Sequence, residues 1–154
     1  MTRINTLDPY LLTDQHLMAE YRELPRIFGL AKLNYDSGKP LPVIDSYRMG
    51  KGHVLFFYGK LRYLKDRHRA IVKELKNRKY SITNESDLME IPGYMNDWVP
   101  NNIEHRISLD RLRFKLETMK AKNVTFYKHY GKPVSKSFYD SCRIGLVKLK
   151  DVKL

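Results

Sequence analysis

The stretch at 14–32, "DQHLMAEYRELPRIFGLAK", decides the fold because its apolar residues recur with the period of an amphipathic helix. The recurring residues are Leu17, Tyr21, Leu24 and Phe28. Thr13 or Asp14 is expected to cap the start of this helix. Pro25 lies inside it, where it removes one main-chain hydrogen bond and is expected to bend the helix.

Two further helices are predicted from the same kind of spacing. One covers 53–78, with an apolar stripe opposite a face of Lys and Arg, and the other covers about 103–120, with Ser108 as an alternative internal start. The segments 34–52 and 80–102 are rich in Gly and Pro and are expected to be irregular.

The predicted fold class is therefore mainly α: a compact single domain of three principal helices with long irregular loops. No strand–helix alternation suggests a parallel sheet. The expected domain covers 1–132, and 133–154 forms a basic C-terminal extension, either a tail or a short strand.

Charge is the strongest signal in the composition. The chain of 154 residues has 29 Lys and Arg against 17 Asp and Glu, a net charge of +12. Such a surface attracts nucleic acid, although a membrane surface or ribosomal RNA would fit the same charge. The single cysteine, Cys142, suits a reducing cytoplasm, and the longest apolar run, "VLFFY" at 54–58, is far too short to span a membrane.

The helix at 14–32 places two arginines on one face, because Arg22 and Arg26 are four residues apart. One interpretation is a solvated basic face in which Glu20 or Glu23 pairs locally. The other is a phosphate clamp around one carboxylate, since an anionic ligand would turn the repulsion into bidentate binding.

A second candidate is "FYKHYGK" at 126–132, which alternates aromatic and basic residues. It suits either a surface that stacks bases and follows a phosphate backbone, or an aromatic cluster in the core. Arg111 and Lys115 form a further basic pair. The histidines lack metal-ligand spacing and no glycine-rich phosphate loop is present, so no metal and no cofactor are expected. His53 is interpreted as a core or capping residue.

The terminus "MTRIN" offers a nucleophile. Met1 is commonly removed before a small residue such as Thr2, and an α-amine has a pKa near 7.7–8.0 against about 10.4 for lysine. Nearby arginines would lower that pKa further. A neutral amine beside a carboxylate can attack a sugar carbon.

These segments together resemble a known family. "MTRIN", "DQHLMAEYRELPRIFG" (14–29), "GHVLFFYGKL" (52–61), "RLRFKL" (111–116) and "FYKHYGK" resemble the phage-type pyrimidine-dimer DNA glycosylase/AP lyases, the endonuclease V family. The resemblance covers most of 1–132, and implies a compact, mostly helical, metal-free enzyme. It also implies a monomer acting in the cytoplasm of a bacterial or phage-infected cell.

The resemblance implies that the Thr2 amine attacks the sugar of the 5′ nucleotide of a cyclobutane pyrimidine dimer. A Schiff base then forms, β-elimination nicks the strand, and Glu23 stabilises the sugar cation. Partners would be duplex DNA with dimers or abasic sites, and undamaged duplex bound non-specifically. The residues expected to hold DNA are Arg3, Gln15, His16, Arg22, Arg26, Arg111, Lys115, Phe126, Tyr127, Lys128, Tyr130 and Lys132.

The chain departs from the family at three places, and two alternatives stay open. The family has tryptophan where this chain has Phe126 and tyrosine where it has His129, and 133–154 has no counterpart. A glycosylase for another lesion, such as a ring-opened purine, is one alternative. A basic nucleic-acid-binding module without catalysis is the other, although Thr2 and Glu23 are both present.

Overall fold

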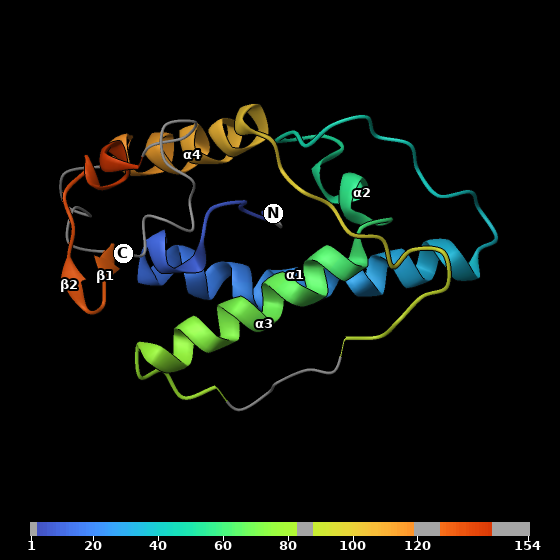
Figure 1. The fold of residues 1–154 in the computed structure, drawn as a ribbon, viewed down its shortest axis with the longest axis horizontal. Coiled ribbons are helices and arrows are strands. Elements are labelled where there is room, and N and C mark those ends of the chain that lie inside the picture. The colour runs from blue at the N-terminus through green and yellow to red at the C-terminus, as the bar shows by residue number, and fades with distance from the viewer. Residues whose placement is uncertain (1–2, 83–87, 119–126, 143–154) are drawn as a thin grey trace. The chain divides into compact units, whose positions relative to one another are not determined.

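The computed structural model describes residues 3–82, 88–118 and 127–142 of the chain (Figure 1). The helices are α1 (Asp14–Asp36), α2 (His53–Phe57), α3 (Leu61–Asn77) and α4 (Asn102–Glu117), with short 3₁₀ turns at Pro9–Leu11 and Phe138–Ser141. The strands β1 (Lys128–His129) and β2 (Lys132–Pro133) form a small antiparallel hairpin. The predicted mainly helical class is confirmed.

The chain divides into two compact units. The first unit comprises Met1–Ile4 and Ala19–Val99, and the second comprises Asn5–Met18 and Pro100–Leu154. Asp14–Met18 of α1 therefore belong to the second unit, and the rest of that helix belongs to the first. A boundary at residue 132 stays a prediction.

Helix α1 begins as its sequence predicts and runs to Asp36 rather than Lys32. Thr13 is the N-cap: its hydroxyl oxygen accepts a hydrogen bond from the His16 N–H at 3.2 Å, and its carbonyl accepts from Leu17 at 2.9 Å. Pro25 lies inside the continuous helix, so neighbouring hydrogen bonds and packing outweigh the bond that it removes.

The predicted helix at 53–78 is divided into α2 and α3. A Cβ at Gly59 would lie 2.7 Å from a terminal methyl group of Leu41, so a larger residue there would require the Leu41 side chain to move. The freed main-chain groups are satisfied by the loop that follows α3: Asn96 donates to the Gly59 carbonyl at 2.8 Å, and Leu61 donates to the Tyr94 carbonyl at 3.0 Å. The break is thus stabilised by tertiary contacts that helical periodicity cannot predict.

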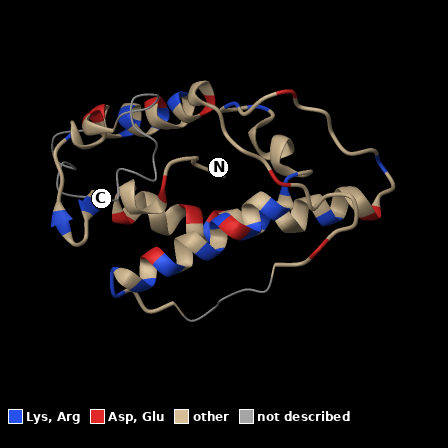
Figure 2. Cartoon of the chain, in the orientation of Figure 1, with Lys and Arg blue, Asp and Glu red and all other residues tan. Residues whose placement is uncertain are grey.

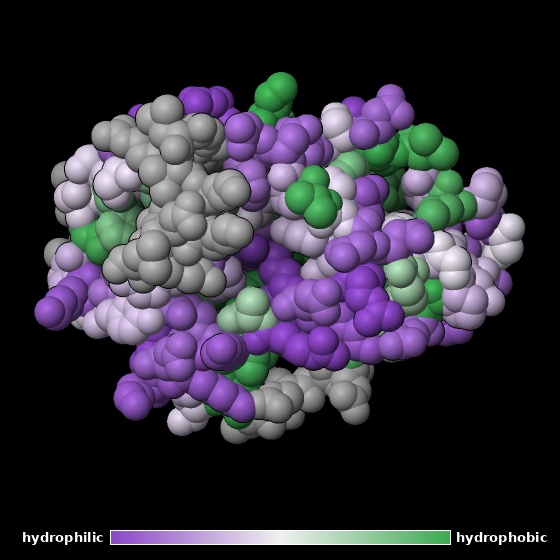
Figure 3. Space-filling model, viewed as in Figure 1, coloured by the Kyte–Doolittle hydropathy of each residue, from purple (hydrophilic) through white to green (hydrophobic). Residues whose placement is uncertain are grey.

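The core of the first unit lies where α1 and α3 run side by side (Figure 1). The predicted stripe is buried on both sides of the break, comprising Phe57, Leu61, Leu64, His68, Ile71 and Leu75. Hydrophilic side chains cover most of the surface of α1 and α3 on the face shown in Figure 3. None of the helices in the described residues combines the length and the apolar character that a membrane span needs.

The second unit is organised around α4 and the first turn of α1. Asn101 and Glu104 form a reciprocal capping box at the start of α4, so this helix begins at Asn102 and not at Ser108. Leu109, Leu112 and Leu116 are buried, as their spacing predicts. The 3₁₀ turn at Phe138–Ser141 packs on α4, where Arg113 pairs with Asp140 at 2.9 Å.

Candidate functional site

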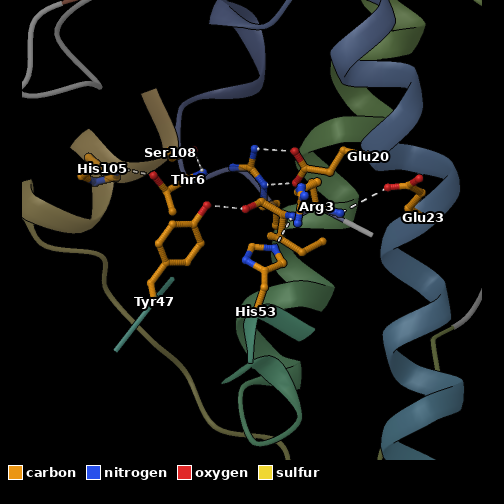
Figure 4. A network of polar contacts seen from close by, with 10 residues as sticks. Arg3, Thr6, Glu20, Glu23, Tyr47, His53, His105 and Ser108 are labelled. Carbon is orange, nitrogen blue, oxygen red and sulfur yellow. Dashed lines mark hydrogen bonds and ion pairs between the residues drawn. The ribbon is translucent and has the colours of Figure 1, made fainter. Parts of the chain in front are cut away.

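The N-terminal segment is held in place by side chains rather than left to fray. The Ile4 N–H donates to Nε2 of His53 at 2.8 Å, and the Ile4 carbonyl accepts from the Tyr47 hydroxyl at 2.7 Å (Figure 4). Ile4 itself is fully buried. The main-chain N–H, the carbonyl and the side chain of Ile4 are therefore all fixed within the first unit. These contacts set the path of the chain at Ile4, two residues after Thr2.

His53 is a buried core residue, one of the two interpretations that the sequence offered, and its hydrogen-bond partners indicate its tautomer. Its Nδ1 lies 2.7 Å from the Arg48 carbonyl, which can only accept, so Nδ1 carries the proton. Nε2 is then a bare acceptor for the Ile4 N–H. We assign a neutral ring from this pattern. His53 is buried and serves to position main chain.

The segment after Ile4 is anchored in the same manner within the second unit. The Thr6 N–H donates to the Ser108 hydroxyl at 3.0 Å, and the Thr6 hydroxyl lies 2.8 Å from Nδ1 of His105. Ser108, which the sequence suggested as a helix start, instead lies within α4 and accepts this hydrogen bond.

Glu23 on α1 contacts the N-terminal segment directly. Its Oε2 accepts the Arg3 main-chain N–H at 3.2 Å, and Figure 4 shows the carboxylate directed at that nitrogen. The Glu23 side chain is half-buried. Thr2, the predicted nucleophile, lies outside the described residues. The structure therefore places the predicted catalytic carboxylate against the residue that follows Thr2 in the chain.

Glu20, one helical turn before Glu23, is engaged elsewhere. Its carboxylate forms a bidentate pair with Nε and Nη2 of Arg67 on α3, the second contact at 3.1 Å. Both side chains are almost fully buried. Burial disfavours the charge of Arg67, but the adjacent carboxylate outweighs this and raises its pKa. Removing one partner would leave a buried charge unpaired, so Glu20 is a structural residue.

The predicted clamp arginines differ in their surroundings. Arg22 and Arg26 are exposed on α1 and form no ion pair with any of the described residues. Arg3 is half-buried, and its Nε and Nη1 are shielded from solvent without a hydrogen-bond partner in the described part of the chain. Figure 2 shows further basic residues along α1 and α3. Shielded guanidinium donors without acceptors favour binding of an anion.

His16 lies at the centre of a second group of predicted residues, all within the second unit. Its ring stacks on Tyr127 with centroids 4.7 Å apart. Burial, then the charges of Lys115 and Arg111 on α4, lower its pKa from 6.5 to about 4. His16 is therefore neutral at physiological pH. The structure brings together the histidine, the aromatic residue and the basic pair that the sequence could only name separately.

The lowered pKa of His16 predicts that the folded protein loses stability in acid. Because the folded pKa of about 4 lies below the unfolded value near 6.5, the unfolded chain gains a proton first as the pH falls. Stability should therefore fall between pH 6.5 and 4, by about 3 kcal/mol from this group. Urea unfolding of the wild type and His16→Gln at pH 7 and 4.5 measures the contribution. Equal losses in both proteins, or an NMR titration of His16 near 6.5, would contradict it.

The hairpin is held to α1 through its main chain. Oδ1 and Oδ2 of buried Asp14 accept the N–H groups of Tyr130 and Gly131 at 3.1 and 2.9 Å, and Oε1 of Gln15 accepts the Lys128 N–H at 2.8 Å. Tyr130 and Gly131 both have positive φ, as a tight two-residue turn requires.

The side chains of this hairpin are largely left to solvent. Lys128, Tyr130 and Lys132 are exposed, whereas Tyr127 is half-buried against His16. The two interpretations of "FYKHYGK" thus apply to different residues: part of the segment packs inward, and part presents aromatic and basic groups. Phe126 lies outside the described residues.

Several residues of these sites were missed by sequence reasoning. They are Tyr47, Arg67, Asp14 as a hairpin anchor, and Tyr139. Each acts on a residue far away in the chain, so no local spacing signals it. Among the described residues, no three His, Cys, Asp or Glu side chains gather as metal ligands would.

Comparison with known protein families matches residues 1–88 to the pyrimidine dimer DNA glycosylases. The matched range includes Arg3, Arg22, Glu23 and Arg26, which the structure gathers in the first unit, as well as Gln15 and His16. The basic pair on α4 and the hairpin lie beyond it. The match covers more than half of the 154 residues, and the chain therefore belongs to the pyrimidine dimer DNA glycosylase family.

Proposed function

We propose that this protein frees the 5′ base of an ultraviolet-induced cyclobutane pyrimidine dimer from its sugar and then nicks the same strand. The nucleophile is the α-amine of Thr2 after removal of Met1. The observation that carries this proposal is the hydrogen bond from the Arg3 N–H to Glu23. Family membership supports the substrate class, which is damaged DNA.

Covalent geometry connects this hydrogen bond to the amine. Only the α-carbon and carbonyl carbon of Thr2 separate its α-nitrogen from the Arg3 nitrogen that bonds to Glu23. A carboxylate at this point can take a proton from the ammonium form, which leaves the amine free to attack. Because two side chains hold Ile4, the α-amine of Thr2 can take only a limited set of positions relative to a bound sugar.

The proposed reaction proceeds in balanced steps. The amine nitrogen bonds to C1′, the glycosidic bond breaks, and the departing base nitrogen takes up a proton. The amine that is now bonded to C1′ loses a proton. The C1′–O4′ bond then opens and O4′ takes up a proton to become a hydroxyl group. C1′ remains joined to the amine nitrogen as an iminium ion, the Schiff base. Loss of a C2′ proton then breaks the C3′–O3′ bond, with the 3′ phosphate as leaving group. No redox partner or cofactor is required.

Glu23 and the arginines have complementary roles in this scheme. The carboxylate stabilises positive charge that develops on the sugar. Arg3, Arg22 and Arg26 bind phosphates around the lesion, and the solvent-shielded donors of Arg3 gain acceptors on binding. The second unit holds the duplex by stacking and charge, through His16, Arg111, Lys115 and the aromatic hairpin. We propose that the enzyme acts as a monomer in the cytoplasm.

The decisive experiment is nicking of supercoiled plasmid in the presence of a chelator. We expect ultraviolet-irradiated plasmid to be converted to the nicked form, and unirradiated plasmid to remain supercoiled, because the amine chemistry needs no metal. Irradiated plasmid whose dimers have been reversed by a photolyase is the matched control. Equal nicking of all three substrates, or none, would refute the proposal.

One further substrate and a binding measurement test the alternatives. Plasmid containing ring-opened purines would be cut in preference if the main lesion is of that kind. A protein that binds irradiated plasmid but cuts neither would be a binding module without catalysis.

A further inference from the structure

Tyr139 lies beyond residues 1–88, which match the family, and it is fully buried. It belongs to the 3₁₀ turn at Phe138–Ser141, which packs on α4. Its hydroxyl oxygen accepts the main-chain N–H of Thr13 at 3.0 Å. Thr13 is the N-cap of α1, so this tyrosine binds at the start of the helix that carries Gln15 and His16.

The same hydroxyl lies 2.7 Å from Nδ1 of His16. A phenol has one proton, and its oxygen already accepts from Thr13, so the proton is available for donation to Nδ1. The Thr13 hydroxyl lies 2.9 Å from Nδ1 and accepts the His16 main-chain N–H, so it is a second candidate donor to the same lone pair; the Tyr139 hydroxyl is the closer of the two. Nδ1 is then the acceptor, and the ring proton of His16 is on Nε2.

Nε2 of His16 is shielded from solvent and has no hydrogen-bond partner in the described part of the chain. Stacking on Tyr127 and the contact with Tyr139 fix the plane of the ring. Lys115 and Arg111 are the charged groups that act on it, and both disfavour an imidazolium. The result is an oriented, neutral N–H donor beside cations, which suits an acceptor oxygen on an anionic ligand.

We propose that Tyr139 is a positioning residue that holds His16 as a neutral Nε2–H donor for an oxygen of the bound DNA. This inference rests on the proposed function for its ligand. It gives residues 133–142 a defined role: they complete the binding surface by setting the state of a residue on α1.

Tyr139→Phe removes the hydroxyl and keeps the ring. In the free protein, long-range ¹H–¹⁵N NMR should show wild-type His16 as the Nε2–H tautomer. In the variant both tautomers should be populated, and the pKa of His16 should rise, because the donor that stabilised the neutral ring is lost. On duplex with a single dimer, KM should rise about tenfold with kcat changed less than about threefold.

Tyr58→Phe is the matched control, since Tyr58 is a buried tyrosine of the first unit whose hydroxyl makes no hydrogen bond within the described residues. It should leave the tautomer, KM and kcat unchanged. An Nδ1–H tautomer in the wild type would overturn the proposal even if Tyr139→Phe fails to fold. So would unchanged KM in a folded variant.

The NMR measurement separates this inference from the proposed function. A wild-type protein that does not cut dimer-containing DNA would refute the function, while the tautomer of His16 would still report whether Tyr139 positions it. Conversely, a fully active Tyr139→Phe would refute the inference and leave the function intact.

Discussion

Glu23→Gln is expected to lower the rate of base release by several orders of magnitude while DNA binding survives. The amide oxygen of glutamine can still accept the Arg3 N–H, so the N-terminal segment should stay in place. What is lost is the negative charge that stabilises the sugar cation and the base that deprotonates the amine. Single-turnover kinetics on duplex with one dimer measures the chemical step.

Binding should be retained or slightly tightened in this variant, because a negative charge near phosphates has been removed. Glu20 cannot substitute for Glu23, since both its oxygens are engaged by Arg67. Glu90→Gln is the control: Glu90 is an exposed carboxylate whose ion-pair partner among the described residues is Lys65, and its loss should leave the rate unchanged. Near-normal base release by Glu23→Gln would remove this residue from the mechanism.

Adding one residue before Thr2 is expected to abolish both activities. The Thr2 nitrogen then becomes an amide, which is not nucleophilic, and the new amine lies one residue further from Glu23. Borohydride reduction of reaction mixtures should trap a covalent adduct with the processed protein and none with the extended one. Mass spectrometry of a chymotryptic digest should locate the adduct at Thr2.

Proteolytic removal of the added residue should restore trapping and nicking, which controls for misfolding. Binding to undamaged duplex should differ little between the two forms, because the arginines are unchanged. An adduct on a lysine, or full activity of the extended protein, would contradict the assignment of the amine.

Local patterns predicted the helices well where packing follows the helical period. The apolar stripes of α3 and α4 are buried as their spacing indicates, and so is that of α1 except for the half-buried Tyr21. The break between α2 and α3 escaped prediction because its cause is remote in sequence: Leu41 fills the space beside Gly59, and Asn96 binds its carbonyl. The hairpin was missed for a related reason: Tyr130 adopts a positive φ in a turn whose main-chain N–H groups are bound by Asp14, which is far away in the sequence.

The sequence identified which residues form the candidate site, but it did not predict what each of them does. Spacing left open whether Glu20 or Glu23 pairs locally on α1; in the structure Glu20 pairs with Arg67, far along the chain, and Glu23 accepts the Arg3 N–H. It also gave no sign that a histidine beside two cations would be neutral, because that follows from burial. The ion pairing and protonation of these residues depend on partners that are distant in sequence, so local patterns can identify the residues but not their chemical state.

The attachment of the hairpin to α1 has a consequence for how this enzyme can change. Asp14 and Gln15 hold main-chain N–H groups, which every residue except proline provides. Side chains at positions 128 and 132 can therefore be exchanged without altering the geometry of the tip, whereas a residue at position 130 must also adopt a positive φ. Histidine in place of the family's tyrosine at position 129 changes a side-chain contact without changing the main-chain hydrogen bonds of the hairpin. Selection can therefore change the range of lesions by single substitutions.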